Sequence, residues 1–354
     1  MNIQTLDYKT LITGLVFFFG LSVQGQNMPR TYVAQKTTIP IKIDGKANES
    51  VWQEAVWSTP FIDIEGVKIP KYHTKFKMIW DEENLYFYAE LKEPHVWATL
   101  KQKDTIIFYN NDFEIFIDPD GDTHNYYEFE MNALNTVWDL FLSKPYRNNG
   151  TITDKWDIKG LKSAVDIQGT LNNATDIDQG WSVEIAIPWS FVTEPGGTPK
   201  IPENEFWRIN FSRVNWSHDV TAGQYSRKKD SNGKFLHENN WVWSPQGVVN
   251  MHEPEHWGYV YFTSDEVGTI SEFNIPKNEH IKWYLYALYC DYEGQKNKEN
   301  KKFLVPKTIF DIQVLPQLAT YKFGWTIWTK SPFTGEILSV NNNGKFINHG
   351  ATKN

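Results

Sequence analysis

The chain has 354 residues, a formal net charge of −8 at pH 7 and a single cysteine, Cys290. This length allows one large or two ordinary domains. The negative charge disfavours nucleic acid as a partner, because a phosphate backbone repels an acidic surface. No internal disulfide can form, so the fold must be stabilised by its hydrophobic core.

Residues 1–26 have the pattern of a secretory signal peptide. Lys9 supplies a positive charge, residues 11–23 have about the length of an h-region, and cleavage is expected near Gln26. The apolar run is too short for a stable membrane anchor. No cysteine stands at the cut, which excludes a lipoprotein signal. We therefore expect a secreted or periplasmic mature protein.

Short apolar segments separated by turn residues follow, from residue 30 to about 264. They predict strands over 32–43, 57–64, 74–80, 85–91, 161–168, 181–187, 206–216, 241–244 and 257–262. Asn48 is a candidate cap for a short helix over 49–55, and Pro188 starts a helical turn. The polar residues 217–240 are expected to form a long surface loop. Many short strands with little helix predict a mainly β domain, an antiparallel, jelly-roll-like β-sandwich.

From residue 268 to 354 the pattern changes to a small α+β appendage. A helix is predicted over 278–292, because four apolar residues share one helical face there: Ile281, Leu285, Leu288 and Tyr292. Strands are predicted over 321–330, 336–340 and 345–347, with turn residues between them.

Residues 110–144 are the stretch around which the chain is organised. Alternating or continuous apolar residues predict three strands, over 113–118, 127–132 and 137–142. The first turn contains Asp118, Asp120 and Asp122, which bring hard oxygens close together. Calcium takes about six to eight oxygen ligands, while aspartate is also common in turns for local hydrogen bonding. The turn is therefore either a calcium site or a solvated hairpin.

Four carboxylates lie on the first two of these strands: Asp112, Glu114, Glu128 and Glu130. Glu114 and Glu130 are expected to be cross-strand neighbours. The group has three interpretations: the polar outer face of a half-solvated sheet, an acidic ligand-binding cluster, or a carboxylate pair for glycoside hydrolysis.

Histidines and tryptophans supply the remaining candidates. His252 and His256 have a zinc-binding i, i+4 spacing, but Pro254 between them argues against a helix, which favours a packing or surface role. The chain contains 16 Trp, which serve either as core residues or as faces for sugar rings.

Several segments occur in the order seen in one known family: IDGKANESVWQEA, FKMIWDEENLYFYAELKEPHVWA, NNDFEIFIDPDGDTHNYYEFEMNALNTVWDL, GWSVEIAIPW, FWRINFSRVNW and NWVWSPQGVVNMHEPEHWGYVYF. Over residues 41–262 the chain resembles the carbohydrate-binding module family 9 domain, in its free-standing secreted bacterial form. The resemblance implies a β-sandwich, structural calcium and carbohydrate binding.

The resemblance also implies a site in which two tryptophans clamp a sugar ring beside an acidic residue and an arginine. The acidic residue matches Glu114, and the first tryptophan falls near Phe108 or Tyr109. The arginine position carries Glu130, which reverses its charge, and residues 250–252 supply no second tryptophan. Trp241 or Trp243 is a candidate for the missing face.

The sequence therefore predicts glycan binding without catalysis, in polysaccharide catabolism. The alternatives are a glycoside hydrolase that uses the Glu114 cluster and a structural or partner-binding module that acts through the appendage. The candidate ligand-binding residues are Phe108, Tyr109, Asp112, Glu114, Glu130, Asn132, Trp241 and Trp243, and the candidate calcium ligands are Asp118, Asp120 and Asp122.

Overall fold

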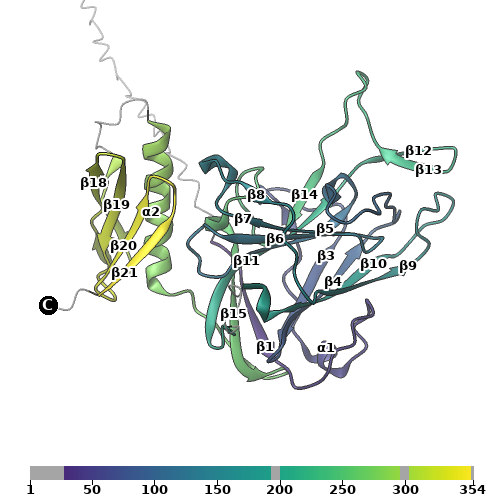
Figure 1. The fold of residues 1–354 in the computed structure, drawn as a ribbon, viewed down its shortest axis with the longest axis horizontal. Coiled ribbons are helices and arrows are strands. Elements are labelled where there is room, and N and C mark those ends of the chain that lie inside the picture. The colour runs from purple at the N-terminus through teal and green to yellow at the C-terminus, as the bar shows by residue number, and fades with distance from the viewer. Residues whose placement is uncertain (1–27, 193–199, 296–302, 352–354) are drawn as a thin grey trace, which may run out of the picture.

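The computed structural model describes residues 28–192, 200–295 and 303–351, so the expected signal peptide lies outside the described residues. Figure 1 shows a large β-rich part and a smaller part that contains a long helix. The strands of the large part are β1 (Thr31–Lys36), β2 (Ile62–Asp63), β3 (Thr74–Trp80), β4 (Asn84–Lys92), β5 (Asp112–Asp118), β6 (Tyr126–Asn132), β7 (Val137–Leu142), β8 (Ile152–Thr153), β9 (Lys162–Gln168), β10 (Gly180–Pro188), β11 (Glu205–Asn215), β12 (His218–Thr221), β13 (Gln224–Arg227), β14 (Asn239–Val242) and β15 (Gly258–Glu266).

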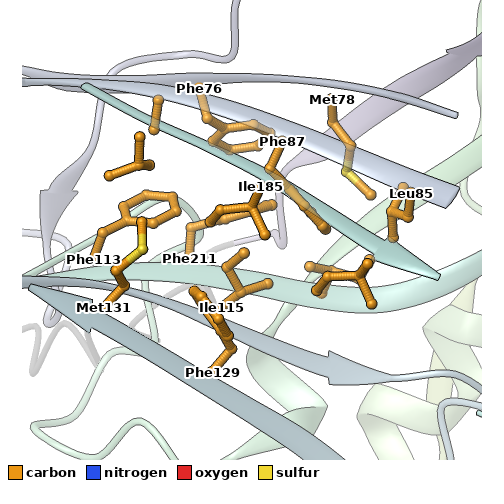
Figure 2. Packing of buried hydrophobic residues seen from close by; sticks show 14 of the residues in the cluster. Phe76, Met78, Leu85, Phe87, Phe113, Ile115, Phe129, Met131, Ile185 and Phe211 are labelled. Carbon is orange, nitrogen blue, oxygen red and sulfur yellow. The ribbon is translucent and has the colours of Figure 1, made fainter. Parts of the chain in front are cut away.

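Hydrogen bonds connect most of these strands in the order β8-β7-β6-β5-β11-β15-β1-β3-β4-β10-β9. Strands β5, β6 and β11 lie in one layer, β3, β4 and β10 lie in the other, and apolar side chains fill the space between them (Figure 2). Strand β1 connects the layers, because residues 31–34 pair with β15 and residues 35–36 pair with β3. Both of these ladders are parallel, in a sandwich whose other described ladders are antiparallel.

The core between the layers is rich in aromatic rings. Figure 2 shows Phe76 and Phe87 on one layer facing Phe113, Phe129 and Phe211 on the other. The rings of Phe76 and Phe211 are stacked, with centroids 3.8 Å apart and planes inclined by 29°. Fully buried aromatic pairs of this kind supply a large part of the free energy of folding, which agrees with a fold that contains no disulfide.

Strands β5 and β6 are buried on both faces. All seven residues of β5 are buried, and in β6 only Tyr127 is partly exposed. The outer face is covered by a second apolar cluster, in which Trp257 packs on Phe116 and Tyr126. The predicted alternation is therefore present, but the polar side chains do not face open solvent.

Several local predictions are confirmed and two are wrong. The helical turn after Pro188 is the 3₁₀ turn η3 (Trp189–Val192). Helix α1 (Ser50–Glu54) has Glu49, and not Asn48, at its N-cap, without a side-chain cap hydrogen bond. The predicted surface loop 217–240 contains the hairpin β12–β13. The pairing of Val220 with Tyr225 fixes this hairpin, whose polar sequence gives no strand signal.

The appendage consists of one helix, a four-stranded sheet that packs on it, and a separate two-stranded sheet. Helix α2 (Lys277–Gly294) buries Ile281, Leu285, Leu288 and Tyr292, as the helical spacing predicts. None of the helices in the described ranges is long and apolar enough to span a membrane. The strands of this part are β16 (Lys307–Ile309), β17 (Ile312–Val314), β18 (Gln317–Tyr321), β19 (Gly324–Lys330), β20 (Glu336–Asn341) and β21 (Phe346–Ala351).

The appendage contacts the sandwich through polar groups. The β20–β21 hairpin meets the aspartate turn: Lys345 Nζ lies 2.7 Å from Asp122 Oδ2, and Thr123 Oγ1 donates to the Gly344 carbonyl at 2.8 Å. Helix α2 meets the turn η2 (Tyr146–Asn148), where Asn148 Nδ2 donates to the Tyr289 hydroxyl at 2.6 Å. Helix α2 also meets β15, where the Tyr259 hydroxyl donates to Glu279 Oε2 at 2.9 Å, so the two parts are docked along the β5–β8 side of the sandwich and at β15.

The stacked phenylalanines give the first prediction. Phe76→Ala removes a fully buried ring from the core between the two layers and is expected to lower the free energy of unfolding by about 3–5 kcal/mol. Phe323→Ala is the matched control, because Phe323 is 88% exposed, and its effect is expected to stay within about 0.5 kcal/mol. Urea unfolding monitored by Trp fluorescence measures both. Equal effects of the two substitutions would contradict the described core.

Candidate functional site

A pocket of about 270 Å³ opens on the outer face of the layer formed by β7, β6, β5 and β11. Its floor comes from these strands and its walls come from loops. The lining residues are Phe108, Glu114, Phe116, Glu128, Glu130, Trp138, Leu140, Tyr146, Val214, Asn240, Met251 and His252.

Strand register brings the polar floor together. Trp138 of β7 lies opposite Glu130 of β6, and Glu130 lies opposite Glu114 of β5. Because side chains two residues apart share one face of a strand, Glu128 lies beside Glu130. The predicted cross-strand neighbourhood of Glu114 and Glu130 is confirmed.

The carboxyl groups of the floor are withdrawn from water. Glu114, Glu128 and Glu130 are 4%, 5% and 2% exposed. Burial raises the pKa of Glu114 to about 7. Burial, together with repulsion from Glu114, raises the pKa of both Glu128 and Glu130 well above the usual glutamate range. This burial excludes the interpretation of these carboxyl groups as a half-solvated outer face. A nearby positive charge or hydrogen-bond donor would stabilise their ionised form.

Two buried polar atoms on the pocket residues have no hydrogen-bond partner within the described part of the chain: Glu128 Oε2, an acceptor, and Trp138 Nε1, a donor. A buried unpaired polar atom costs roughly 1–3 kcal/mol. The pocket therefore has one unsatisfied acceptor and one unsatisfied donor for a polar ligand.

The walls are held by specific contacts. The backbone N–H of Phe108, in the 3₁₀ turn η1 (Ile107–Tyr109), donates to Glu130 Oε2 at 3.0 Å. His252 Nδ1 lies 2.9 Å from the Tyr126 hydroxyl, and its ring centroid lies 4.4 Å from that of Tyr146. Burial lowers the pKa of His252 to about 4, so this wall is uncharged at neutral pH.

The histidine pair does not form a two-histidine metal site. The turn η4 (Pro254–His256) carries His256, whose ring nitrogen can share a metal ion with Glu253 and Glu255, whereas His252 belongs to the pocket. The proline between the two histidines interrupts the helix that zinc ligation would require.

The structure places three of the eight candidate ligand-binding residues on the pocket lining: Phe108, Glu114 and Glu130. Asp112 lies just behind them, and one of its oxygens is within 4.8 Å of ligand atoms of Glu114 and Glu130. Its Oδ1 accepts the Val214 N–H at 3.2 Å.

The other four candidates lie elsewhere. Asn132 is fully buried, and its side chain accepts the Leu134 N–H at 3.0 Å in the β6–β7 turn. Trp243 is 1% exposed and packs in the core, so it offers no face to a ligand. Trp241 lines a separate groove of about 1080 Å³ that also includes Asn240. Tyr109 is 42% exposed on the outer surface, beneath the Arg227 guanidinium.

Apart from Phe108 and the three glutamates, the sequence did not assign the lining residues to a ligand site, for two different reasons. Phe116 and Trp138 share faces with Glu114 and Glu130, so strand alternation and register could have identified them. Tyr146, Met251 and His252 come from turns distant in sequence, and their approach to the sheet has no local signal.

The aspartate turn is a second group of converging oxygens. Asp118, Asp120 and Asp122 each offer a carboxylate oxygen within 4.8 Å of the others. Asp118 accepts the N–H groups of Gly121 and Thr123 at 3.0 and 2.9 Å, which fixes its carboxylate. Burial, followed by repulsion among the three, raises the pKa of Asp118 and Asp120. This all-oxygen donor set fits calcium, with Lys345 compensating one of the charges.

With this geometry described, the comparisons with known proteins assign the family. Residues 43–260 match the family described as "Carbohydrate family 9 binding domain-like". The match covers more than half of the chain, so the protein belongs to this family. Non-catalytic carbohydrate binding is the function that this membership supports, and the resemblance seen in the sequence is confirmed.

Individual relatives match only in part. The chain is 28% identical over 123 residues to endo-1,4-beta-xylanase A of Thermoanaerobacterium saccharolyticum, which is 34% of this chain and 9% of that enzyme. It is 34% identical over 86 residues to endo-1,4-beta-xylanase C of Paenibacillus barcinonensis, 24% of this chain and 7% of that enzyme. The chain thus spans less than a tenth of the length of these relatives.

Among solved structures, a family 9 carbohydrate-binding module of Caldicellulosiruptor kristjanssonii in complex with cellotriose has a TM-score of 0.43 at 16% identity. The similarity covers 70% of this chain and 100% of that chain. The same module in complex with glucose gives a TM-score of 0.44 at 16% identity, over 69% of this chain and 100% of that chain.

The buried floor predicts a pH dependence of stability. The pKa of Glu114 is about 7 in the folded state and 4.5 in the unfolded chain. Protonated Glu114 is therefore favoured by folding, and this contribution is full below pH 4.5 and is lost as the pH rises through about 7. Its size is on the order of 3 kcal/mol.

Between about pH 5 and pH 8, the free energy of unfolding is expected to decrease less in Glu114→Gln than in the unaltered protein, because glutamine does not titrate. Urea unfolding at the two pH values measures this difference. Glu203→Gln, on the exposed surface, should retain the full pH dependence. An unchanged pH dependence in Glu114→Gln would show that Glu114 ionises normally in the fold.

Proposed function

We propose that the pocket on the outer face of β5, β6 and β7 binds one sugar unit of a glycan, without catalysis, in polysaccharide catabolism. The observation that carries this assignment is the unpaired donor and acceptor, Trp138 Nε1 and Glu128 Oε2, on two side chains of one pocket. A sugar hydroxyl donates one hydrogen bond and accepts others. One ring with adjacent hydroxyls can therefore satisfy both atoms.

The walls supply the apolar half of such a site. Trp138 and Phe108 are partly exposed, and Tyr146 is 48% exposed at the rim. Aromatic rings offer flat apolar area at little cost in side-chain entropy, and the C–H face of a sugar packs on them. The carboxyl groups of the floor then hydrogen-bond the hydroxyls at the ring edge.

A larger groove adjoins the pocket and gives room for further sugar units. Asn240 lines both spaces, and the groove of about 1080 Å³ also includes Tyr72, Trp216 and Trp241. Trp241 is the candidate residue that belongs to this groove. We assign the pocket to one terminal or internal sugar unit and the groove to the neighbouring units of the glycan.

A second part of the proposal concerns calcium and location. The aspartate turn would hold a calcium ion through Asp118, Asp120 and Asp122, where the ion would stabilise the β5–β6 hairpin. A polysaccharide ligand requires access to the outside of the cell, and the expected signal peptide over residues 1–26 supports a secreted or periplasmic protein.

Glycan binding is tested at the rim of the pocket. Tyr146→Ala should weaken binding of the best ligand from a panel of soluble oligosaccharides by roughly three- to tenfold, because one aromatic contact contributes about 0.5–1.5 kcal/mol. Isothermal titration measures the affinity. Tyr321→Ala is the matched control, since Tyr321 is 66% exposed outside the pocket. Equal affinities of both variants and the unaltered protein would place the binding site elsewhere.

Calcium binding is tested by thermal unfolding with calcium and with chelator. At about a hundredfold excess over its dissociation constant, calcium should raise the free energy of unfolding by about 2.7 kcal/mol. Asp120→Asn should remove most of this gain. The control is Asp219→Asn, which changes an exposed aspartate in β12. Identical gains in all three proteins, or none in the unaltered one, would contradict a calcium site at this turn.

A further inference from the structure

The pocket lining can carry a large negative charge. Its lining includes three carboxyl groups, Glu114, Glu128 and Glu130, and contains no lysine or arginine. Asp112 adds a fourth acidic group behind the floor. When these carboxyl groups are ionised, their charge therefore has no counter-ion among the lining residues of the pocket.

The neighbouring basic side chains are engaged elsewhere. Arg147 donates to Glu255 at 2.8 Å and lies over the Tyr286 ring. Arg213, fully buried, forms an ion pair with Glu93. His252, the only histidine on the pocket wall, is held against the Tyr126 hydroxyl at 2.9 Å. The compensating charge is therefore left to the ligand.

Glu128 gives an independent observation that points to a ligand. It is 5% exposed, it lines the pocket, and its Oε2 has no hydrogen-bond partner within the described residues. A buried carboxylate oxygen without a partner is among the most costly polar groups in a protein. A positively charged donor on a ligand forms a stronger hydrogen bond with such an oxygen than a neutral donor does.

We propose that the sugar unit bound in this pocket carries a free ammonium group, so that the ligand is an amino-sugar glycan whose amine is not acetylated. This inference rests on the proposed function, because it specifies the kind of sugar that the same pocket takes. The ammonium group lies among Glu114, Glu128 and Glu130 and donates hydrogen bonds to their oxygens.

The pocket walls favour an organic ammonium over a bare metal ion. Phe108, Phe116 and Trp138 line the pocket beside the carboxyl groups. Aromatic faces attract an ammonium group through cation–π interactions. A calcium ion takes about six to eight oxygen ligands and gains nothing from the aromatic rings in this lining.

The test compares three β-1,4-linked tetramers of equal length: glucosamine, N-acetylglucosamine and cellotetraose. Isothermal titration uses the protein from residue 27 to 354 at about pH 5.5, because a sugar amine is less basic than an alkyl amine, and at about 0.15 M salt, where long-range attraction is screened. The glucosamine tetramer is expected to bind at least tenfold more tightly than either neutral tetramer.

Two variants distinguish binding in the pocket from a general attraction of the cationic ligand to an acidic protein. Glu128→Gln and Glu203→Gln each replace one carboxyl group by an amide, but only Glu128 lines the pocket. Glu128→Gln should reduce the preference for the glucosamine tetramer about tenfold, as expected for loss of a charge-assisted hydrogen bond. Glu203→Gln should preserve the preference. Thermal unfolding verifies that both variants are folded.

Each remaining outcome is decisive. Equal or tighter binding of a neutral tetramer overturns the ammonium inference while the proposed glycan binding stands. Equal losses in the two variants also overturn it, because the attraction is then not local to the pocket. Binding that chelator abolishes in Asp120→Asn as well, a variant expected to lack the turn calcium, shows that a metal ion in the pocket supplies the positive charge, which overturns it as well. Binding of none of the three tetramers contradicts both the inference and, for these glycans, the proposed function.

Discussion

Burial of both faces of β5 and β6 is the constraint on which the rest of the structure depends. Their inner faces pack into the aromatic core around Phe76 and Phe211. Their outer faces are covered by loops, so Glu128 and Glu130 are removed from water rather than solvated. A sheet covered in this way cannot tolerate polar side chains without partners. The pocket is the place where the cover is incomplete, and there a ligand can supply the missing partners.

The appendage contacts two turns beside the pocket-forming strands. The turn η2 presents Tyr146 to the pocket, while its next two residues, Arg147 and Asn148, contact Tyr286 and Tyr289 of α2. Lys345 of the appendage also pairs with Asp122 of the β5–β6 turn. Both contacts lie at one end of the pocket-forming strands, where β5 ends, β6 begins and β7 ends.

The sequence predicted the elements well where periodicity is strong. Strands β3, β4, β5 and β6 and helix α2 follow their hydrophobic patterns, and register placed Glu114 opposite Glu130. Long-range packing was less predictable. Trp243 looked available for a ligand because it lies at a strand end, yet it is buried against Tyr32 and Phe76. The parallel pairing of β1 depends on strands that are distant in sequence, and the residue pattern of β1 alone does not specify it.

The most direct test of the central claim, that the bound sugar lies on the outer face of β5 and β6, is a crystal structure of the protein with the tightest-binding tetramer. We expect one sugar ring in the pocket, with polar atoms within hydrogen-bond distance of Glu128 Oε2 and Trp138 Nε1. A tetramer confined to the groove beside Trp241, or bound to the appendage, with these two atoms still unpaired, would contradict the claim.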